Sequence, residues 1–233
     1  RPITATTGRR PEVNADCPLP QDDYPTVQLA HGGGGRLMRQ LLDELILPTL
    51  RPDGARGLHD AARLEALPAG AQLAFTTDSY VVRPLFFPGG DIGSLAVHGT
   101  VNDLAMAGAR ALALSVSLIL EEGLPMPTLR RVLASLRQAA DAAEVRIVTG
   151  DTKVVERGRG DGLYINTAGI GALAAGVRVH PDRIRAGDAL LVSGDIARHG
   201  MAVLARREGL EFETAIDSDC QPLWDTVCAL LDA

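Results

Sequence analysis

The chain has 233 residues, of which 46% are hydrophobic and 3% aromatic, so it is long enough for one or two domains with a sizeable core. Its net charge of −6, without any cluster of basic residues, argues against a nucleic-acid-binding protein. The longest nearly apolar run, residues 111–120, is about half of the ~20 residues that span a bilayer, so no membrane-spanning helix is expected.

Cysteine usage and the N-terminal residues bear on the cellular compartment. The three cysteines form no Cys-x-x-Cys pair, which is typical of reduced thiols in a cytoplasmic protein. The chain begins Arg-Pro-Ile-Thr-Ala-Thr-Thr-Gly, which lacks the apolar segment of a signal peptide. We therefore expect a cytoplasmic protein.

The first part of the chain is predicted to be an extended arm followed by a helix. Residues 1–26 carry five prolines among polar residues, a pattern typical of an arm without a core of its own. Residues 27–30 predict a short strand, and the glycine run Gly32–Gly35 opens a helix that Pro48 is expected to end. The apolar residues of this helix recur at helical spacing: Leu37, Met38, Leu41, Leu42, Leu45 and Ile46.

The central part alternates between strands and helices. Four strands are expected, at residues 72–77, 111–120, 145–149 and 163–173. Residues 91–108 have the pattern of a helix buried on most sides, and an amphipathic helix with Pro127 in its first turn follows the second strand. This order predicts an α/β (α+β) fold with a mixed sheet and flanking helices.

A domain boundary is predicted near residues 174–176. Beyond it we expect a strand at 188–193 and helices at 201–207 and 222–231, which are too few elements for a closed core. The chain therefore divides into an arm, a first domain and an incomplete second α+β domain, at residues 1–26, 27–175 and 176–233.

Three acidic residues lie at the ends of apolar runs or inside them. Asp78 and Asp151 follow predicted strands, and Asp103 lies within the predicted buried helix, where an unpaired carboxylate is costly. Coordination of a hard cation beside phosphates would explain all three. The alternatives are a turn carboxylate for Asp78, an arginine-paired buried acid for Asp103, and a strand-end turn with a solvated lysine for Asp151.

Two further motifs are compatible with phosphate binding. The glycine run before a helix is either a flexible turn or an anion site made of backbone amides, and its spacing matches neither a Walker A loop nor GxGxxG. Gly150, Asp151, Thr152 and Lys153 combine an acid for metal with a hydroxyl and an ammonium for phosphate oxygens. Among the histidines, which show no ligand spacing, His31 is the one possible functional exception.

Seven segments in unbroken order together resemble the HypE family of hydrogenase maturation factors. They include Leu-Ala-His-Gly-Gly-Gly-Gly-Arg, Phe-Thr-Thr-Asp-Ser-Tyr-Val-Val, Gly-Thr-Val-Asn-Asp-Leu-Ala and Val-Thr-Gly-Asp-Thr-Lys-Val-Val, at residues 29–36, 75–82, 99–105 and 148–155. The others are at 84–93, 119–125 and 164–169. The resemblance implies a PurM-like fold whose first domain forms a homodimer through its sheet and binds magnesium-ATP near the dimer interface.

The resemblance also assigns roles to residues. Asp60, Asp78 and Asp103 would be metal ligands, although Asp60 precedes Ala-Ala-Arg and is equally typical of a helix cap. Lys153 and Asp151 would be catalytic. The nucleotide site would comprise Gly32, Gly33, Gly34, Gly35, Asp78, Asn102, Asp103, Gly150, Asp151, Thr152 and Lys153.

In HypE proteins, ATP drives dehydration of a carbamoylated C-terminal cysteine to a thiocyanate, the source of the iron cyanide ligand. The resemblance thus implies HypF as carbamoyl donor and a HypC–HypD complex as cyanide acceptor. This chain ends at Ala233 without the family's cysteine tail, so we expect ATP binding here and the carrier cysteine elsewhere. The alternatives are a PurM-like small-molecule phosphoryl-transfer enzyme and a non-catalytic dimerisation module that recruits partners.

Overall fold

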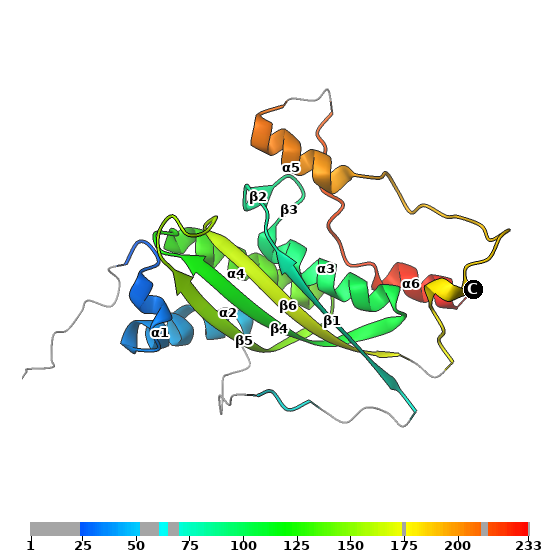
Figure 1. Ribbon diagram of the computed structural model, residues 1–233, viewed down its shortest axis with the longest axis horizontal. Helices are drawn as coiled ribbons and strands as arrows, with labels where there is room; N and C mark the ends of the chain where they lie inside the picture. The colour runs from blue at the N-terminus through cyan, green and yellow to red at the C-terminus, as the bar shows by residue number, and fades with distance from the viewer. Residues whose placement is uncertain (1–23, 52–60, 65–69, 174–175, 211–213, 233) are drawn as a thin grey trace, which may run out of the picture.

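A four-stranded mixed sheet lies at the centre of the computed structural model, which describes residues 24–51, 61–64, 70–173, 176–210 and 214–232. The strands lie in the order β1-β6-β4-β5, with β6 antiparallel to β1 and β4, and β4 parallel to β5 (Figure 1). Their bounds are Gln72–Tyr80 (β1), Ala109–Glu121 (β4), Arg146–Val155 (β5) and Leu163–Leu173 (β6). The predicted α/β class with a mixed sheet is confirmed.

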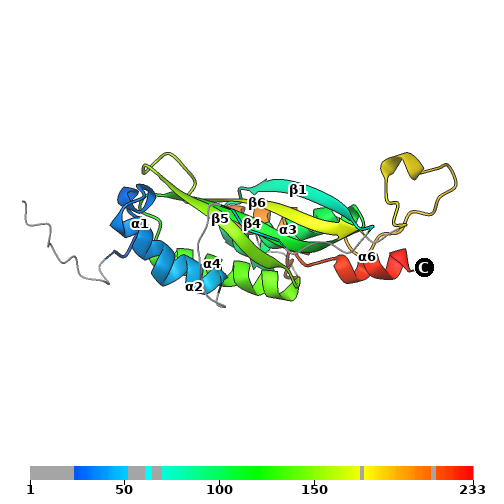
Figure 2. The same cartoon turned by 90° about the horizontal axis from the view of Figure 1, so that it is seen from below.

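Helices cover one face of this sheet. α3 (Ile92–Met106) and α4 (Met126–Ala142) pack on it, and Figure 2 shows α4 and α2 on the same side. Along β6, alternate residues are buried against the helices, Leu163 and Ile165 among them, because successive side chains of a strand point to opposite faces. On the opposite face Leu73 and Phe75 of β1 are 65% and 69% exposed. The core therefore lies between the sheet and one helical layer.

The N-terminal helical segment differs from its prediction in two ways. The short strand expected at residues 27–30 is not formed, and its last two residues instead begin a 3-10 turn, η1 (Leu29–Gly32). Pro48 does not end the helix, because a π-helical turn, η2 (Leu42–Ile46), connects α1 (Arg36–Leu41) to α2 (Leu47–Leu50). Proline lacks an N–H and its ring clashes with the carbonyl four residues earlier in an α-helix, and the wider π turn accommodates both effects.

The two central helices agree with their predictions. Asp91 caps α3, its carboxylate accepting from the backbone N–H groups of Gly93 and Ser94 at 2.7 and 3.2 Å. A short hairpin of β2 (Phe86–Phe87) and β3 (Gly90–Asp91) precedes α3 and was not predicted. The apolar stripe of α4 is fully buried, with Pro127 in the first turn: Leu129, Val132, Leu133 and Leu136.

Two strands continue well past their predicted C-terminal ends, and β4 is also slightly longer than predicted at both ends. Asp78 lies inside β1, which continues to Tyr80, and the Gly-Asp-Thr-Lys segment lies inside β5, which continues to Val155. The prediction ended both strands where polar side chains begin. Strand pairing, however, uses backbone groups, so polar residues continue a strand wherever their side chains reach solvent.

The last part of the chain has two helices, α5 (Arg198–Glu208) and α6 (Trp224–Leu231), and a 3-10 turn, η3 (Pro181–Arg183). The strand predicted at 188–193 is absent from the described residues, and Leu190 there is 93% exposed, because no neighbouring strand pairs with it. Within the part of the chain that the structure describes, no helix is long and apolar enough to cross a membrane. The domain bounds remain a prediction.

Candidate functional site

The glycine run packs directly on β5. A Cβ on Gly32 would lie 2.8 Å from the Val154 backbone nitrogen and 2.9 Å from the Val154 Cβ, so this contact requires glycine. Gly34 has φ +72°, a conformation that side-chain-bearing residues rarely adopt; a Cβ on Gly33 would make only an ordinary contact, and Gly35 faces open space. The turn before α1 thus has bare backbone packed against Val154 of β5.

Within the Gly-Asp-Thr-Lys segment, the side chains divide between the two faces of the sheet. Asp151 and Lys153 are exposed on the face without helices, where the Lys153 Nζ lies 3.5 Å from the Asp151 Oδ2. Thr152 is 4% exposed and points to the helical face. Gly150 is pressed against the carbonyl of Val116, so a Cβ there would collide with β4. Asp151 and Lys153 therefore present the charged groups of this segment.

Asp78 and Asp103 lie at the other edge of the sheet. Thr76 Oγ1 donates to Asp103 Oδ2 at 3.0 Å, and the Ser79 backbone N–H donates to Asp78 Oδ1 at 2.7 Å. Both carboxylates are exposed, so the expected burial of Asp103 is wrong. α3 runs along β1, which is an edge strand, and solvent reaches this side of the helix. Both carboxylates are therefore accessible to a cation from solvent.

Asn102 precedes Asp103 and was expected to line the phosphates. Its side-chain Nδ2 donates to the Gln221 carbonyl at 3.0 Å, and its Oδ1 accepts from the Leu223 backbone N–H at 2.9 Å. Both ends of the amide are thus bonded to residues more than a hundred positions away in the sequence. In this structure Asn102 joins two segments of the chain.

The predicted site residues therefore form two groups. Gly32–Gly35, Asp151 and Lys153 lie at the β5 edge, while Asp78 and Asp103 lie at the β1 edge. Three strand spacings of about 4.8 Å place these edges roughly 14 Å apart. Asp60 lies outside the described residues.

A row of polar residues crosses the exposed face and was missed by the sequence analysis. Strand pairing aligns Ser79 of β1, Asn166 of β6, Ser117 of β4 and Asp151 of β5. Asn166 Nδ2 donates to the Asp78 carbonyl at 2.9 Å and to Ser79 Oγ at 3.0 Å. The signal in the sequence was an asparagine in a largely apolar strand, and only the strand register shows its neighbours.

His31, the histidine singled out by the sequence, is structural. It is 4% exposed, and its Nδ1 accepts from the Gln28 backbone N–H at 2.8 Å. Burial lowers its pKa, which keeps the ring neutral, and Tyr24 packs edge-on against it. It therefore supports the turn that contains the glycine run.

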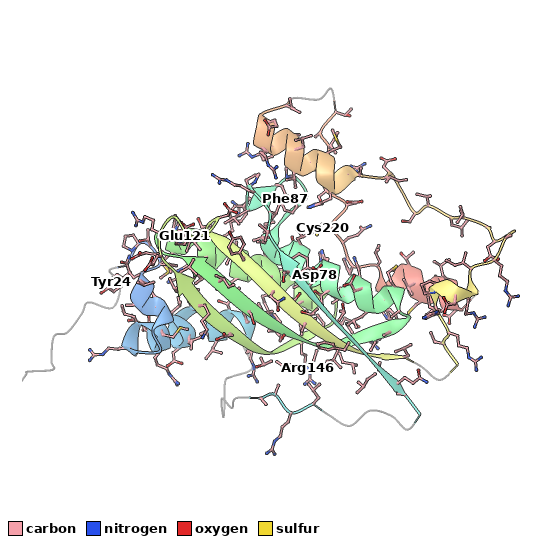
Figure 3. The ribbon with its side chains drawn as sticks, in the orientation of Figure 1. Tyr24, Asp78, Phe87, Glu121, Arg146 and Cys220 are labelled. Atoms are coloured by element: carbon pink, nitrogen blue, oxygen red, sulfur yellow. The ribbon has the colours of Figure 1, made fainter. Side chains whose placement is uncertain are left out.

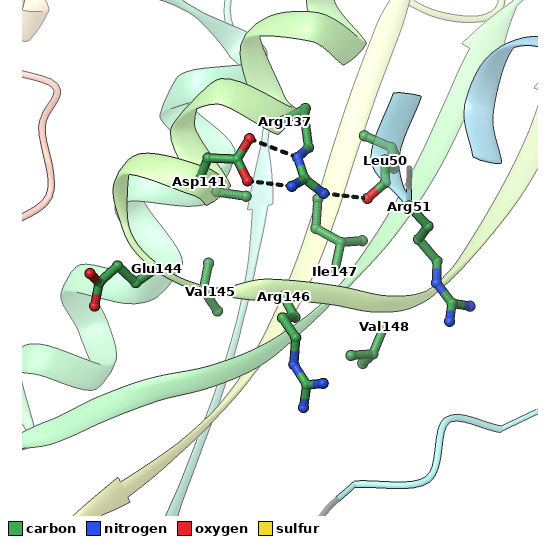
Figure 4. Close-up of a pocket in the computed structure, with 10 residues that line it drawn as sticks. Leu50, Arg51, Arg137, Asp141, Glu144, Val145, Arg146, Ile147 and Val148 are labelled. Atoms are coloured by element: carbon green, nitrogen blue, oxygen red, sulfur yellow. Dashed lines mark hydrogen bonds and ion pairs between the residues drawn. The ribbon is translucent and has the colours of Figure 1, made fainter. Parts of the chain in front are cut away.

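Two cavities flank β5. One of about 330 Å³ lies between the end of α2, α4 and the start of β5; Arg137 there binds Asp141 and the Leu50 carbonyl, while Arg51 and Arg146 point away from that pair (Figure 4). The other, of about 200 Å³, lies between the π turn and residues 148–152 of β5. The second cavity adjoins the Gly-Asp-Thr-Lys segment.

The described residues contain no group of three or more acidic, histidine or cysteine side chains placed to hold a metal ion by themselves. Magnesium, however, is usually bound through one or two carboxylates together with substrate phosphates and waters. Asp78 and Asp103, two exposed carboxylates on neighbouring elements, fit that mode (Figure 3 shows Asp78 on β1).

Comparison with known proteins supplies the family. Residues 58–173 match the family of AIR synthase related proteins, N-terminal domain. Carbamoyl dehydratase HypE of Cupriavidus necator is 51% identical over 205 residues, which cover 88% of this chain and 58% of that protein. A crystal structure of the hydrogenase maturation protein HypE in complex with ATP superposes with a TM-score of 0.83 at 49% identity, covering 88% of this chain and 60% of that one.

A crystal structure of a HypE–HypF complex is also similar, with a TM-score of 0.68 and 50% identity over 72% of this chain and 54% of that one. The fold and the family match define a protein of the AIR synthase related class. Within that class, the chain belongs to the HypE family of hydrogenase maturation proteins. It spans about 60% of the length of the relatives it matches.

Proposed function

We propose that this chain is the magnesium-ATP-binding part of a HypE-type carbamoyl dehydratase that acts in [NiFe]-hydrogenase maturation. The observation that carries the proposal is the glycine turn packed on β5 at Val154, the residue that follows the exposed Asp151–Lys153 pair in the chain. Bare backbone amides and an ammonium group are suited to phosphate oxygens. A similar HypE has been crystallised with ATP, which supports the same ligand here.

Each group has a role in this proposal. Asp78 and Asp103 hold magnesium, which masks the phosphate charge, while Lys153 contacts phosphate oxygens and stabilises charge that develops during transfer. Asp151, 3.5 Å from the Lys153 ammonium, orients it. Transfer of the γ-phosphoryl group of ATP to the amide oxygen of a carbamoylated cysteine releases ADP and one amide proton, and loss of phosphate with the remaining N–H proton leaves a thiocyanate.

We propose that the carrier thiol in this chemistry is a cysteine other than Cys220. Burial raises the pKa of the Cys220 thiol to about 11, and nearby Asp91 and Asp219 contribute to the increase. A thiol with that pKa carries little thiolate at neutral pH, whereas carbamoyl transfer requires the nucleophilic thiolate. The carrier is proposed to be a cysteine tail of the family's kind, outside residues 1–233.

A second copy of the chain is the proposed partner at the exposed sheet face, giving a homodimer. The two groups of site residues lie at opposite edges of one sheet, so a copy packed across this face can bring the β5 edge of one chain near the β1 edge of the other. HypF is the proposed carbamoyl donor, in line with the HypE–HypF complex of a similar protein, and HypC–HypD the proposed cyanide acceptor.

Calorimetry of magnesium-ATP binding tests the proposal. The double variant Asp78→Asn, Asp103→Asn removes both proposed metal ligands while keeping side-chain size, so binding is expected to weaken tenfold or more, about 1.4 kcal/mol or greater. Asp182→Asn, an exposed acid in η3, serves as the matched control with unchanged affinity. Equal affinities for the wild type and the double variant would disprove the site assignment.

A further inference from the structure

Residues 217–223, here called the strap, run alongside α3 on their way from α5 to α6 (Figure 1). Asn102, on α3, binds the strap at two points, donating to the Gln221 carbonyl and accepting from the Leu223 backbone N–H. When one amide side chain donates a hydrogen bond to a backbone segment and accepts another from it, both the position and the direction of that segment are fixed.

Three other contacts hold the strap. One helical turn before Asn102, His98 Nδ1 lies 3.4 Å from Cys220 Sγ, and Figure 3 shows Cys220 beside the start of α3. The Ser218 backbone N–H donates to the Pro88 carbonyl at 2.9 Å, and a Cβ on Gly89 would lie 2.6 Å from the Ser218 nitrogen. The strap thus fits closely against both the β2–β3 hairpin and α3.

The opposite side of the same helical turn is fixed to the sheet. Thr100 is buried and hydrogen-bonds Tyr80 of β1 and Thr167 of β6, and Thr76 of β1 donates to Asp103. Asn102 and Asp103 are adjacent, so one turn of α3 carries the strap contact and the proposed metal ligand together. A displacement of the strap therefore acts directly on the turn that positions Asp103.

This arrangement argues against direct phosphate binding by Asn102. Its donor and its acceptor are both used, and a phosphate could be bound only after the bonds to Gln221 and Leu223 were broken. Breaking them would leave two backbone groups to find other partners.

We propose that Asn102 is a positioning residue, which docks the strap on α3 and so couples the chain after residue 176 to the carboxylates of Asp78 and Asp103. The inference rests on the proposed function, in which these carboxylates hold magnesium-ATP. Docking of the strap keeps Asp103 in place for the metal, and bound magnesium-ATP in turn protects the strap, because such coupling is reciprocal.

The experiment combines amide hydrogen exchange with calorimetry on the whole chain. Asn102→Ala removes two hydrogen bonds, so exchange at the Leu223 amide is expected to rise on the order of tenfold or more. Exchange at the Ser218 amide, which Asn102 does not touch, rises with it because the strap is released as a unit. Magnesium-ATP binding weakens about three- to tenfold, while binding of ATP without metal is unchanged.

Gln221→Ala is the matched control, because it alters the strap but keeps the carbonyl that Asn102 uses. Its exchange and its affinity should equal those of the wild type. If Asn102→Ala does not fold, strap exchange and magnesium-ATP affinity are measured on Asn102→Asp instead. Its carboxylate still accepts from the Leu223 N–H but repels the Gln221 carbonyl.

Two results would overturn the proposal. Weaker magnesium-ATP binding with unchanged strap exchange would mean that Asn102 touches the phosphates, and faster strap exchange with unchanged affinity would mean that strap and site are uncoupled. If the wild-type chain does not bind magnesium-ATP, both the proposed function and the coupling are refuted. Faster amide exchange of the strap in Asn102→Ala without nucleotide would then still show that Asn102 docks the strap on α3.

Discussion

At the scale of single residues, close contacts decide which positions of the glycine run are replaceable. A Cβ on Gly32 would collide with the backbone and the side chain of Val154, whereas a Cβ on Gly33 would lie 3.7 Å from its nearest neighbour, the Ala30 carbonyl. Both have backbone angles that other residues can adopt, so the two positions differ in the space available for a side chain and not in backbone conformation. The turn is held on β5 through the first glycine of the run.

Gly32→Ala should therefore destabilise the chain, and Gly33→Ala should not. The added methyl group of the Gly32 variant must displace the turn from β5, at a cost of about 1–3 kcal/mol typical of overpacking. Urea unfolding measures both variants against the wild type. Equal midpoints for the two variants would contradict the close packing of this turn.

At the scale of elements, α3 is joined to the sheet by a buried network of hydroxyl groups. The Tyr80 hydroxyl of β1 bonds Thr100 of α3 at 3.0 Å, and Thr100 also bonds Thr167 of β6. Gly99 leaves room for the Tyr80 ring, since a Cβ there would collide with the hydroxyl. The helix that carries Asp103 is thus fixed to two strands at once.

This network predicts a loss of stability at high pH. Burial raises the pKa of Tyr80 to about 12 from its ordinary value of 10.0, so the folded chain holds the phenol proton more tightly than the unfolded chain. The resulting contribution is complete below pH 10 and is lost as the pH rises toward 12. Urea unfolding at several pH values measures it.

The comparison variant is Tyr80→Phe, which cannot ionise at this position. It should cost about 1 kcal/mol at neutral pH, because one buried hydrogen bond is lost, and its stability should fall less steeply above pH 10 than that of the wild type. Parallel pH profiles for the two proteins would show that Tyr80 does not titrate as the structure indicates.

At the scale of the whole molecule, the sheet is covered on one face only. Leu73, Phe75 and Ile119 are exposed on the other face, around the polar row that runs from Ser79 to Asp151. A sheet face that combines exposed apolar side chains with an aligned polar row is suited to a protein partner. We expect a second copy of the chain there, as the proposed homodimer requires.

Phe75→Asp should convert the dimer to a monomer, because it places a charge in the centre of the apolar contact. Leu190→Asp, at a position that is 93% exposed and outside the sheet, is the control that should remain dimeric. Sedimentation velocity measures the mass in solution. A wild-type monomer, or a Phe75→Asp dimer, would rule out this face as the interface.

Much of the fold could be predicted from the sequence because its signals are local. The apolar spacing of α4, the helical pattern of residues 91–108 and the bounds of β6 depend on neighbouring residues alone, and the structure confirms the elements they predict. The glycine run and the Gly-Asp-Thr-Lys segment were equally visible as short motifs. That the glycine run packs on the strand that contains the Gly-Asp-Thr-Lys segment could not be predicted from local patterns. This contact depends on the packing of η1 against β5, more than a hundred residues away in the sequence.

What the sequence by itself determined is therefore the set of elements and the chemical character of the candidate residues. The tertiary structure decided the rest: that Asp103 is exposed, that Asn102 binds the strap, and that Asp78 and Asp151 lie at opposite edges of the sheet. The strand expected at residues 188–193 does not form, for the same reason. A side chain's face and partners, and a strand's pairing, are set by segments distant in the sequence, which local patterns do not encode.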